Sequence, residues 1–499
     1  MQTSRRQFIE RTLGGGLLLG GGLSFLSRLN PVSAAEAQLD PSLVRIDSGL
    51  EKTVKLLEET PQERLLEEVA TRIKGGLSYR EVLAALLLAG VRNVQPRPAV
   101  GFKFHAVLVI NSAHLASLAS PDADRWLPIF WALDRFKSAQ LETQKANGWR
   151  MGAVDELKVP PPSKAREAFI RAMDAWDEAG ADAAAASLAR NAGRNEVFEL
   201  FARYGARDFR DIGHKAIFVA NSFRTLECIG WQHAEPVLRS LAYALLKFDG
   251  ENPAKADTLP DRPWRQNIEL VKKVRLDWQD GKPSSEATSH LLSVFRTASD
   301  EEASAAVVDT LNQGISPASI WDALMSSSAE LLMRRTGIIT LHSVTSSNAL
   351  RYSYKTSADP QTRLMLLLQN AAFVPLFRAA AGKLGDARVD QIAVEPAEDG
   401  INGIFDATSR DRTAAAQKAL AYLDGGGDAE ALMHTARKLV FLKGNDAHDY
   451  KFSSAVLEDF NHLSPAWRNR YLAAGFFYLP GSQTKDNPLV GRIRSAFGA

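Results

Sequence analysis

Helical periodicity runs through almost the whole chain, and it limits the folds that this sequence can adopt. Apolar residues recur three and four positions apart in segments such as 51–88, 213–229 and 360–381, as they do on the buried face of an α-helix. Alternating β-branched runs joined by Asn-Gly or Asp-Gly turns are nearly absent. No repeat of fixed length is visible, which argues against a solenoid. The sequence therefore predicts an all-α protein, a large irregular helical bundle with a buried central site.

The first 35 residues have the features of an export signal. Arg5 and Arg6 precede an apolar, glycine-rich run from Leu13 to Leu26, and small residues follow at 31–37. This arrangement resembles a twin-arginine signal peptide, so we expect the twin-arginine translocation machinery as a partner and a periplasmic or exported location. The alternative is an N-terminal membrane anchor, but a run of 14 residues is short for a span of about 20. No later segment has 18 uninterrupted apolar residues, so we predict no membrane span after processing.

Charge and cysteine content exclude several classes of protein. The chain has 60 Lys and Arg against 58 Asp and Glu, and removal of the basic leader brings the net charge close to zero. No basic excess remains for binding nucleic acid. The one cysteine, Cys228, permits neither an internal disulfide nor a cysteine-based metal site. We treat residues 36–499 as one helical domain, with a candidate internal boundary at the proline-rich segment 249–265.

Histidines inside apolar segments are the unusual part of the residue inventory. His105 and His114 are nine residues apart, which places them on opposite faces of one helix, so only one of them can point at a given site. His214 opens a buried helix, and His342 precedes a run of small hydroxyl residues. A single buried histidine is more often a hydrogen-bonded core residue than a ligand. Several in one all-helical chain can converge on one point, because helices of a bundle project side chains inward.

Two further segments add titratable groups near the carboxyl terminus. His434 lies in the middle of a predicted helix, in the segment 431–434. His448 and Lys451 are three residues apart, and therefore share a face if their segment is helical. Familiar catalytic motifs are missing: there is no phosphate-binding glycine loop, no His-Glu-x-x-His and no Gly-x-Ser-x-Gly.

The ordered set of histidine segments resembles the questin oxidase-like family. The segments are Gly213-His214-Lys215-Ala216-Ile217, Leu341-His342-Ser343-Val344-Thr345-Ser346 and Asp446-Ala447-His448-Asp449-Tyr450-Lys451. Their order and separation agree with the family from His114 to Lys451. The resemblance implies a non-haem iron oxygenase that opens a ring of polycyclic aromatic phenols with molecular oxygen. It also implies the metal ligands His114, His214, His342, His434 and a carboxylated Lys451. Asp446, His448, His105 and Thr345 would support these ligands without binding the metal themselves.

Three functional readings follow from these observations. The favoured one is an exported metal-dependent oxygenase, using non-haem iron, that acts on a small aromatic or polycyclic phenolic substrate. The alternative is a non-catalytic helical binding protein of the envelope whose histidines are structural. A cofactor protein such as a haem protein is the third reading, although covalent haem is excluded because Cys-x-x-Cys-His does not occur.

Overall fold

The protein is helical throughout the part of the chain that the structure describes. The structure is a computed structural model, and it describes residues 49–97, 101–120, 122, 124–396 and 399–497. These ranges contain 22 α-helices and no strand, only one isolated β-bridge between Lys282 and Ile315. The prediction of an all-α fold is confirmed. The predicted signal peptide at residues 1–35 lies outside the described residues.

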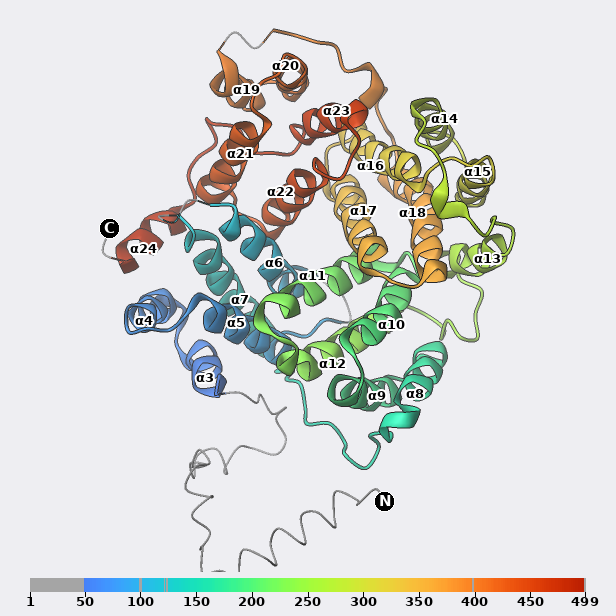
Figure 1. Cartoon of the computed structure of the whole chain (residues 1–499). Coiled ribbons are helices and arrows are strands. Elements are labelled where there is room, and N and C mark those ends of the chain that lie inside the picture. Colours follow the sequence, from blue (N-terminus) through green and yellow to red (C-terminus); the bar gives the residue numbers. More distant parts are fainter. Residues whose placement is uncertain (1–48, 98–100, 121, 123, 397–398, 498–499) are drawn as a thin grey trace, which may run out of the picture. The chain divides into compact units, whose positions relative to one another are not determined.

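The helices are joined by connections that range from short turns to loops of more than ten residues, and five of these connections include a 3₁₀ segment (Figure 1). The first ten are α3 (Glu51–Glu59), α4 (Gln62–Lys74), α5 (Tyr79–Asn93), α6 (Gly101–Leu118), α7 (Leu127–Ala146), α8 (Pro162–Ala175), α9 (Glu178–Asn191), α10 (Arg194–Ala206), α11 (His214–Ile229) and α12 (Ala234–Leu245). The next six are α13 (Arg262–Val271), α14 (Ser285–Phe295), α15 (Asp300–Asn312), α16 (Pro317–Arg334), α17 (Ile338–Thr356) and α18 (Pro360–Ala381). The last six are α19 (Gly400–Thr408), α20 (Arg412–Asp424), α21 (Ala429–Lys443), α22 (Ala447–Asp459), α23 (Pro465–Gly475) and α24 (Pro488–Phe497).

Many of these helices begin at a residue that satisfies the first free backbone N–H groups. Ser78 starts α5 and Ser299 starts α15, each in a capping box with the glutamate three residues later. Asp446 starts α22 in the same way, paired with Asp449. Each such cap stabilises its helix by about 1 kcal/mol. The cap of α22 also contributes to the candidate site, as described below.

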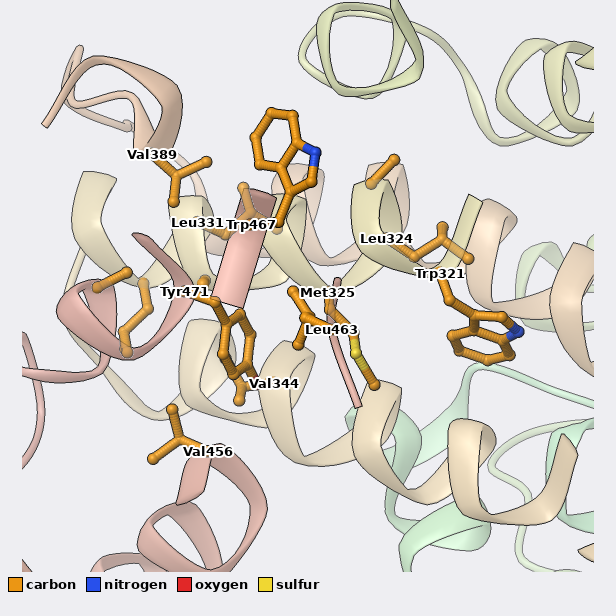
Figure 2. Packing of buried hydrophobic residues seen from close by; sticks show 14 of the residues in the cluster. Trp321, Leu324, Met325, Leu331, Val344, Val389, Val456, Leu463, Trp467 and Tyr471 are labelled. Atoms are coloured by element: carbon orange, nitrogen blue, oxygen red, sulfur yellow. The ribbon is translucent and has the colours of Figure 1, made fainter. Parts of the chain in front are cut away.

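The main hydrophobic core lies where α16, α17, α22 and α23 meet. Figure 2 shows Trp321 and Met325 of α16 with Val344 of α17, Val456 of α22 and Trp467 of α23. All five side chains are buried. Burying one large apolar side chain stabilises the fold by roughly 1.5–3 kcal/mol, so this cluster is a principal source of stability in a chain without disulfides.

Helices from both halves of the chain pack around one centre. The described residues, from 49 onward, belong to one compact unit. Within it, α6 contacts α11, α11 contacts α17, α17 contacts α22, and α22 contacts α6 (Figure 1). The segment 249–265 connects α12 to α13 inside this unit, and Asp261 accepts hydrogen bonds of 2.7 Å from the guanidinium of Arg210. The four-helix arrangement of α6, α11, α17 and α22 holds the candidate site.

Helix α18 is both long and apolar. Among the described helices, α18 is long and apolar enough to cross a bilayer, but 78% of its most apolar stretch is buried inside the protein. Burial of this kind is typical of a core helix, and α18 packs against α17.

Candidate metal centre

Four histidines and one lysine meet between α6, α11, α17 and α22. The side chains are His105 of α6, His214 of α11, His342 of α17, and His448 and Lys451 of α22, all of them buried. Their rings form a closed circuit of neighbours. Ring centroids lie 4.8 Å apart for His105 and His214, 4.3 Å for His214 and His342, 5.1 Å for His342 and His448, and 4.6 Å for His448 and His105. We call these five residues the histidine cluster.

The nitrogens of the histidine cluster have the spacing of ligands around one cation. His105, His342 and His448 each offer a ring nitrogen, and these atoms all lie within 4.8 Å of one another. Nε2 of His214 is 3.0 Å from Nε2 of His105, and Nζ of Lys451 is 3.3 Å from Nε2 of His342. Two imidazole nitrogens bound tetrahedrally at about 2.0–2.1 Å lie about 3.3 Å apart. The cluster can therefore close around a metal ion with small movements.

In His214 and His342, Nδ1 donates a hydrogen bond to a backbone carbonyl outside the cluster. The other ring nitrogen, Nε2, therefore keeps its lone pair. Nδ1 of His342 is 2.6 Å from the carbonyl oxygen of Ile338, and Nδ1 of His214 bonds to the carbonyl oxygen of Asp211. A carbonyl only accepts, so both Nδ1 atoms carry the proton and donate, which leaves Nε2 as the acceptor. Metal-binding histidines are oriented in this way by an acceptor outside the site.

His448 is held by a carboxylate instead of a carbonyl. Its Nδ1 lies 2.6 Å from Oδ1 of Asp446, the residue that also caps α22 by accepting the backbone N–H of His448 at 2.8 Å. One carboxylate thus fixes both the start of the helix and the orientation of the ring. This carboxylate–histidine pair is a common arrangement behind a metal ligand, since it raises the basicity of the inner nitrogen.

A strained turn delivers His214 to the cluster. Asp211, Ile212 and Gly213 all have left-handed backbone conformations, with φ of 51°, 48° and 79°. The conformation is unfavourable for an L-residue and especially for a β-branched one such as Ile212, so the surroundings must impose it. Nζ of Lys247 binds the Asp211 carboxylate at 2.5 Å. The turn points the carbonyl of Asp211 at the His214 ring.

Burial keeps His214 and His342 in the neutral state that binds metal. Burial lowers the pKa of His214 and of His342 well below the usual value for histidine, and the neighbouring Lys451 lowers both further. Both rings are therefore neutral at pH 7. Burial likewise lowers the pKa of Lys451 to about 7. A lysine with that pKa has a substantial neutral fraction, which is the nucleophilic form.

Two adjoining cavities lead from the histidine cluster toward solvent. The inner cavity, of about 10 Å³, reaches Lys451 and is lined by Asn111, Ser112, Ile217, Asn221, Arg224, Thr345, Asn348, Lys451, Ser454 and Ala455. The outer cavity, of about 160 Å³, is lined by Leu115, Ala116, Ala119, Arg437, Ser453, Ser454, Leu457, Glu458 and Asn461. Ser454 belongs to both linings, so the two spaces are neighbours. The inner cavity has room for about one water-sized group, and the outer one is smaller than the range of about 300–1,000 Å³ of drug-sized ligand sites.

Five of the predicted site residues gather here. The structure brings His214, His342 and Lys451 together, and it places His105 and His448, predicted as supporting residues, inside the cluster itself. Two more predicted residues lie next to the cluster. Asp446 holds His448, and Thr345 lines the inner cavity.

The structure does not bring the predicted ligands His114 and His434 into the histidine cluster. His114 lies nine residues beyond His105, about 13 Å farther along α6, and its Nδ1 is 2.9 Å from the hydroxyl of Tyr79. The rotation of α6 presents His105 to the cluster and turns His114 away. His434 lies half-buried on α21, and none of the ring contacts and hydrogen bonds that define the cluster involves it. His105 and His448 occupy the places predicted for these two.

Apart from Thr345 and Lys451, the polar residues of the inner cavity were not among the predicted site residues. Ser112 lies seven residues after His105, and Asn221 lies seven residues after His214. Seven residues are two helical turns, so each pair shares one face of its helix. A search for polar residues at this spacing from each buried histidine would have found both of them.

Comparisons with known proteins identify no relative. No family model, no curated protein and no solved structure matches the chain. The resemblance to the questin oxidase-like family therefore stays a prediction.

Proposed function

We propose that the chain binds one iron ion in the histidine cluster and acts as an exported non-haem oxygenase on an aromatic or polycyclic phenolic substrate. The observation that carries the metal site is the convergence of inner ring nitrogens. His214, His342 and His448 each have Nδ1 engaged by an acceptor outside the cluster, so that Nε2 is the ring nitrogen that carries the lone pair. The oxygenase chemistry and the substrate class rest on the family resemblance.

Structural histidines give a weaker account of this geometry. Nε2 of His214 is paired with Nε2 of His105 at 3.0 Å, and Nε2 of His342 with Nζ of Lys451 at 3.3 Å, so the basic nitrogens of the cluster have one another as partners in the buried interior. A cation shared by several nitrogens satisfies all of them at once. Four imidazoles contributed by four helices from distant parts of the chain fit a shared ligand better than four separate core residues.

The donor set favours a metal of intermediate softness. Imidazole suits iron, zinc and copper, and the cluster contains no thiolate. Iron bound here would supply the activation of molecular oxygen. The residues of the chain would hold it, with Asp446 fixing His448 and the carbonyl of Asp211 fixing His214.

Lys451 supplies the anionic ligand in this proposal. Its neutral amine attacks carbon dioxide, a C–N bond forms, and one proton leaves to solvent, so that a carbamate results. A carbamate is a hard oxygen ligand that complements neutral imidazoles. The lowered pKa of Lys451 and the inner cavity beside it support this step.

Export completes the proposal. A twin-arginine signal at residues 1–35 would carry the protein to the periplasm after folding, so the metal could be loaded in the cytoplasm. A route for folded proteins suits a site whose ligands come from the whole length of the chain.

Metal analysis of full-length protein purified after folding in cells tests the proposal. We expect about one iron per chain in the wild type, and loss of most of it in His342→Ala and in Lys451→Ala. His114→Ala is the matched control, since it removes a buried histidine outside the cluster and should keep the metal. Wild-type protein that holds no metal after anaerobic reconstitution with Fe(II), or His342→Ala protein with full metal content, would contradict it. Oxygen uptake with phenolic substrates then tests the reaction.

A further inference from the structure

We infer that the inner cavity binds an uncharged molecule through a hydrogen-bond donor, such as a hydroxyl group, that reaches Asn111 and Thr345. The apolar part of the same molecule would lie in the outer cavity. This inference deepens the proposed function, because it states how a substrate would be held beside Lys451. It stands on two unsatisfied polar atoms and on the chemistry of the two cavity linings.

The orientation of the Asn111 amide is set by its neighbours. Nδ2 of Asn221 donates to the carbonyl oxygen of Leu108 at 2.8 Å, which turns Oδ1 of Asn221 toward Nδ2 of Asn111, 3.4 Å away. The Oδ1 atom of Asn111 is thereby left as the free end of this chain of amides. It is buried and has no hydrogen-bond partner among the residues that the structure describes. An unpaired acceptor in the lining of a cavity calls for a donor on the ligand.

Thr345 provides the second unsatisfied group. It lies one helical turn after His342 on α17 and lines the same cavity as Asn111. Its hydroxyl oxygen is also buried without a partner in the described part of the chain. A hydroxyl can donate and accept, so Thr345 and Asn111 together suit a ligand hydroxyl, which does both. Buried polar groups are nearly always hydrogen-bonded, and two exceptions in one cavity point to a missing partner.

The two cationic side chains of the inner cavity, Arg224 and Lys451, both have hydrogen-bond partners. Nη2 of Arg224 is 2.8 Å from a carboxylate oxygen of Glu458, and Nη1 is 3.3 Å from the side-chain oxygen of Asn348. Lys451 donates to Nε2 of His342. Arg224 therefore already has an anionic partner, and Lys451 is directed at a histidine, so we infer an uncharged ligand.

The outer cavity has a different lining on its α6 side. Leu115, Ala116 and Ala119 lie there, and Leu457 of α22 faces the same space. The alanines leave room for a flat apolar body. The outer lining also includes Arg437, Glu458 and Asn461, and Ser454, shared by both linings, lies where the inner cavity meets the outer one. A molecule with one polar end would therefore point that end toward Lys451.

Binding of two matched probes to the purified full-length chain tests this inference. Phenol has a hydroxyl donor, whereas anisole has the same ring without one, and isothermal titration calorimetry compares their affinities. We expect phenol to bind at least tenfold more tightly than anisole. Thr345→Val keeps the shape of the side chain but removes the hydroxyl, and should reduce the preference at least fivefold. Asn111→Leu should do the same.

A second threonine gives the control. Thr143 of α7 is also buried with an unpartnered hydroxyl, but it does not line either cavity. Thr143→Val should leave the preference for phenol unchanged. Equal affinities for phenol and anisole in the wild type would overturn the inference, as would an unchanged preference in folded Thr345→Val. Tighter binding of benzoate than of phenol would overturn the uncharged class. If the wild type holds no metal but still binds phenol more tightly than anisole, the proposed metal site is wrong and the inference about the inner cavity stands.

Discussion

Substitution of Gly213 by alanine should destabilise the protein and displace His214. Gly213 has φ of +79°, a conformation that disfavours an L-residue by about 1–2 kcal/mol. A Cβ at this position would lie 2.8 Å from Cβ of Ser346 and closer still to its hydroxyl oxygen. Ser346 is buried on α17, so relief of the overlap requires a shift in packing that costs about 1–3 kcal/mol. The expected loss in the free energy of unfolding is about 2–5 kcal/mol.

Gly426→Ala separates the two contributions. Gly426 has φ of +82°, but nothing lies within 4 Å of the position of its added Cβ. Gly426→Ala should lower the free energy of unfolding by only about 1–2 kcal/mol, the cost of the left-handed backbone conformation. Guanidinium unfolding measures both variants, and metal analysis of Gly213→Ala reports whether His214 remains in place. The double variant Gly213→Ala/Ser346→Gly should recover part of the steric loss but none of the conformational loss. Equal losses in the two single variants would refute the argument that Ser346 confines the turn.

The remaining predictions concern three other parts of the chain. Burial lowers the pKa of Lys137 to about 8, so unfolding takes up a proton between pH 8 and 10.5. The free energy of unfolding should therefore rise by about 3 kcal/mol across that window, relative to the Lys137→Met variant. Urea titration at several pH values measures this difference. A parallel pH dependence in the variant would show that Lys137 is not the cause. Asp446→Asn should weaken metal binding about 10–100-fold by loosening His448, as measured by competition with a chelator; unchanged affinity would contradict the role of the carboxylate. Changing Arg5 and Arg6 together to lysine should abolish export, and normal periplasmic yield would indicate a general secretory signal.

The fold could be predicted from the sequence because helical periodicity is a local property. Apolar residues three and four apart identify α11, α17 and α18 without knowledge of their neighbours. The site was accessible only in part. His214 and His342 stood out as histidines within buried helices, and Lys451 shared a face with His448. These inferences needed only the period of the helix.

The choice between His105 and His114 depended on information that the local sequence does not contain. Their spacing puts them on opposite faces of α6, and the rotation of α6 is set by its packing against α7, α11 and α22. The strained turn before His214 was equally inaccessible. Gly213 hints at a left-handed residue, but nothing in the sequence indicates that Asp211 and Ile212 share that conformation, since distant contacts such as Lys247 impose it.

The wide spacing of the histidine cluster along the chain has a consequence for the timing of assembly. His105 lies on α6 and His448 on α22, with His214 and His342 between them. At about 5–20 residues per second, a ribosome needs roughly 20–70 s to pass from the first of these residues to the last. The nascent chain cannot present all four rings to one ion during that interval. A bound ion would therefore report that synthesis has reached α22 and that both halves of the chain have docked, so a chain truncated before that helix would leave the ribosome without the means to retain it.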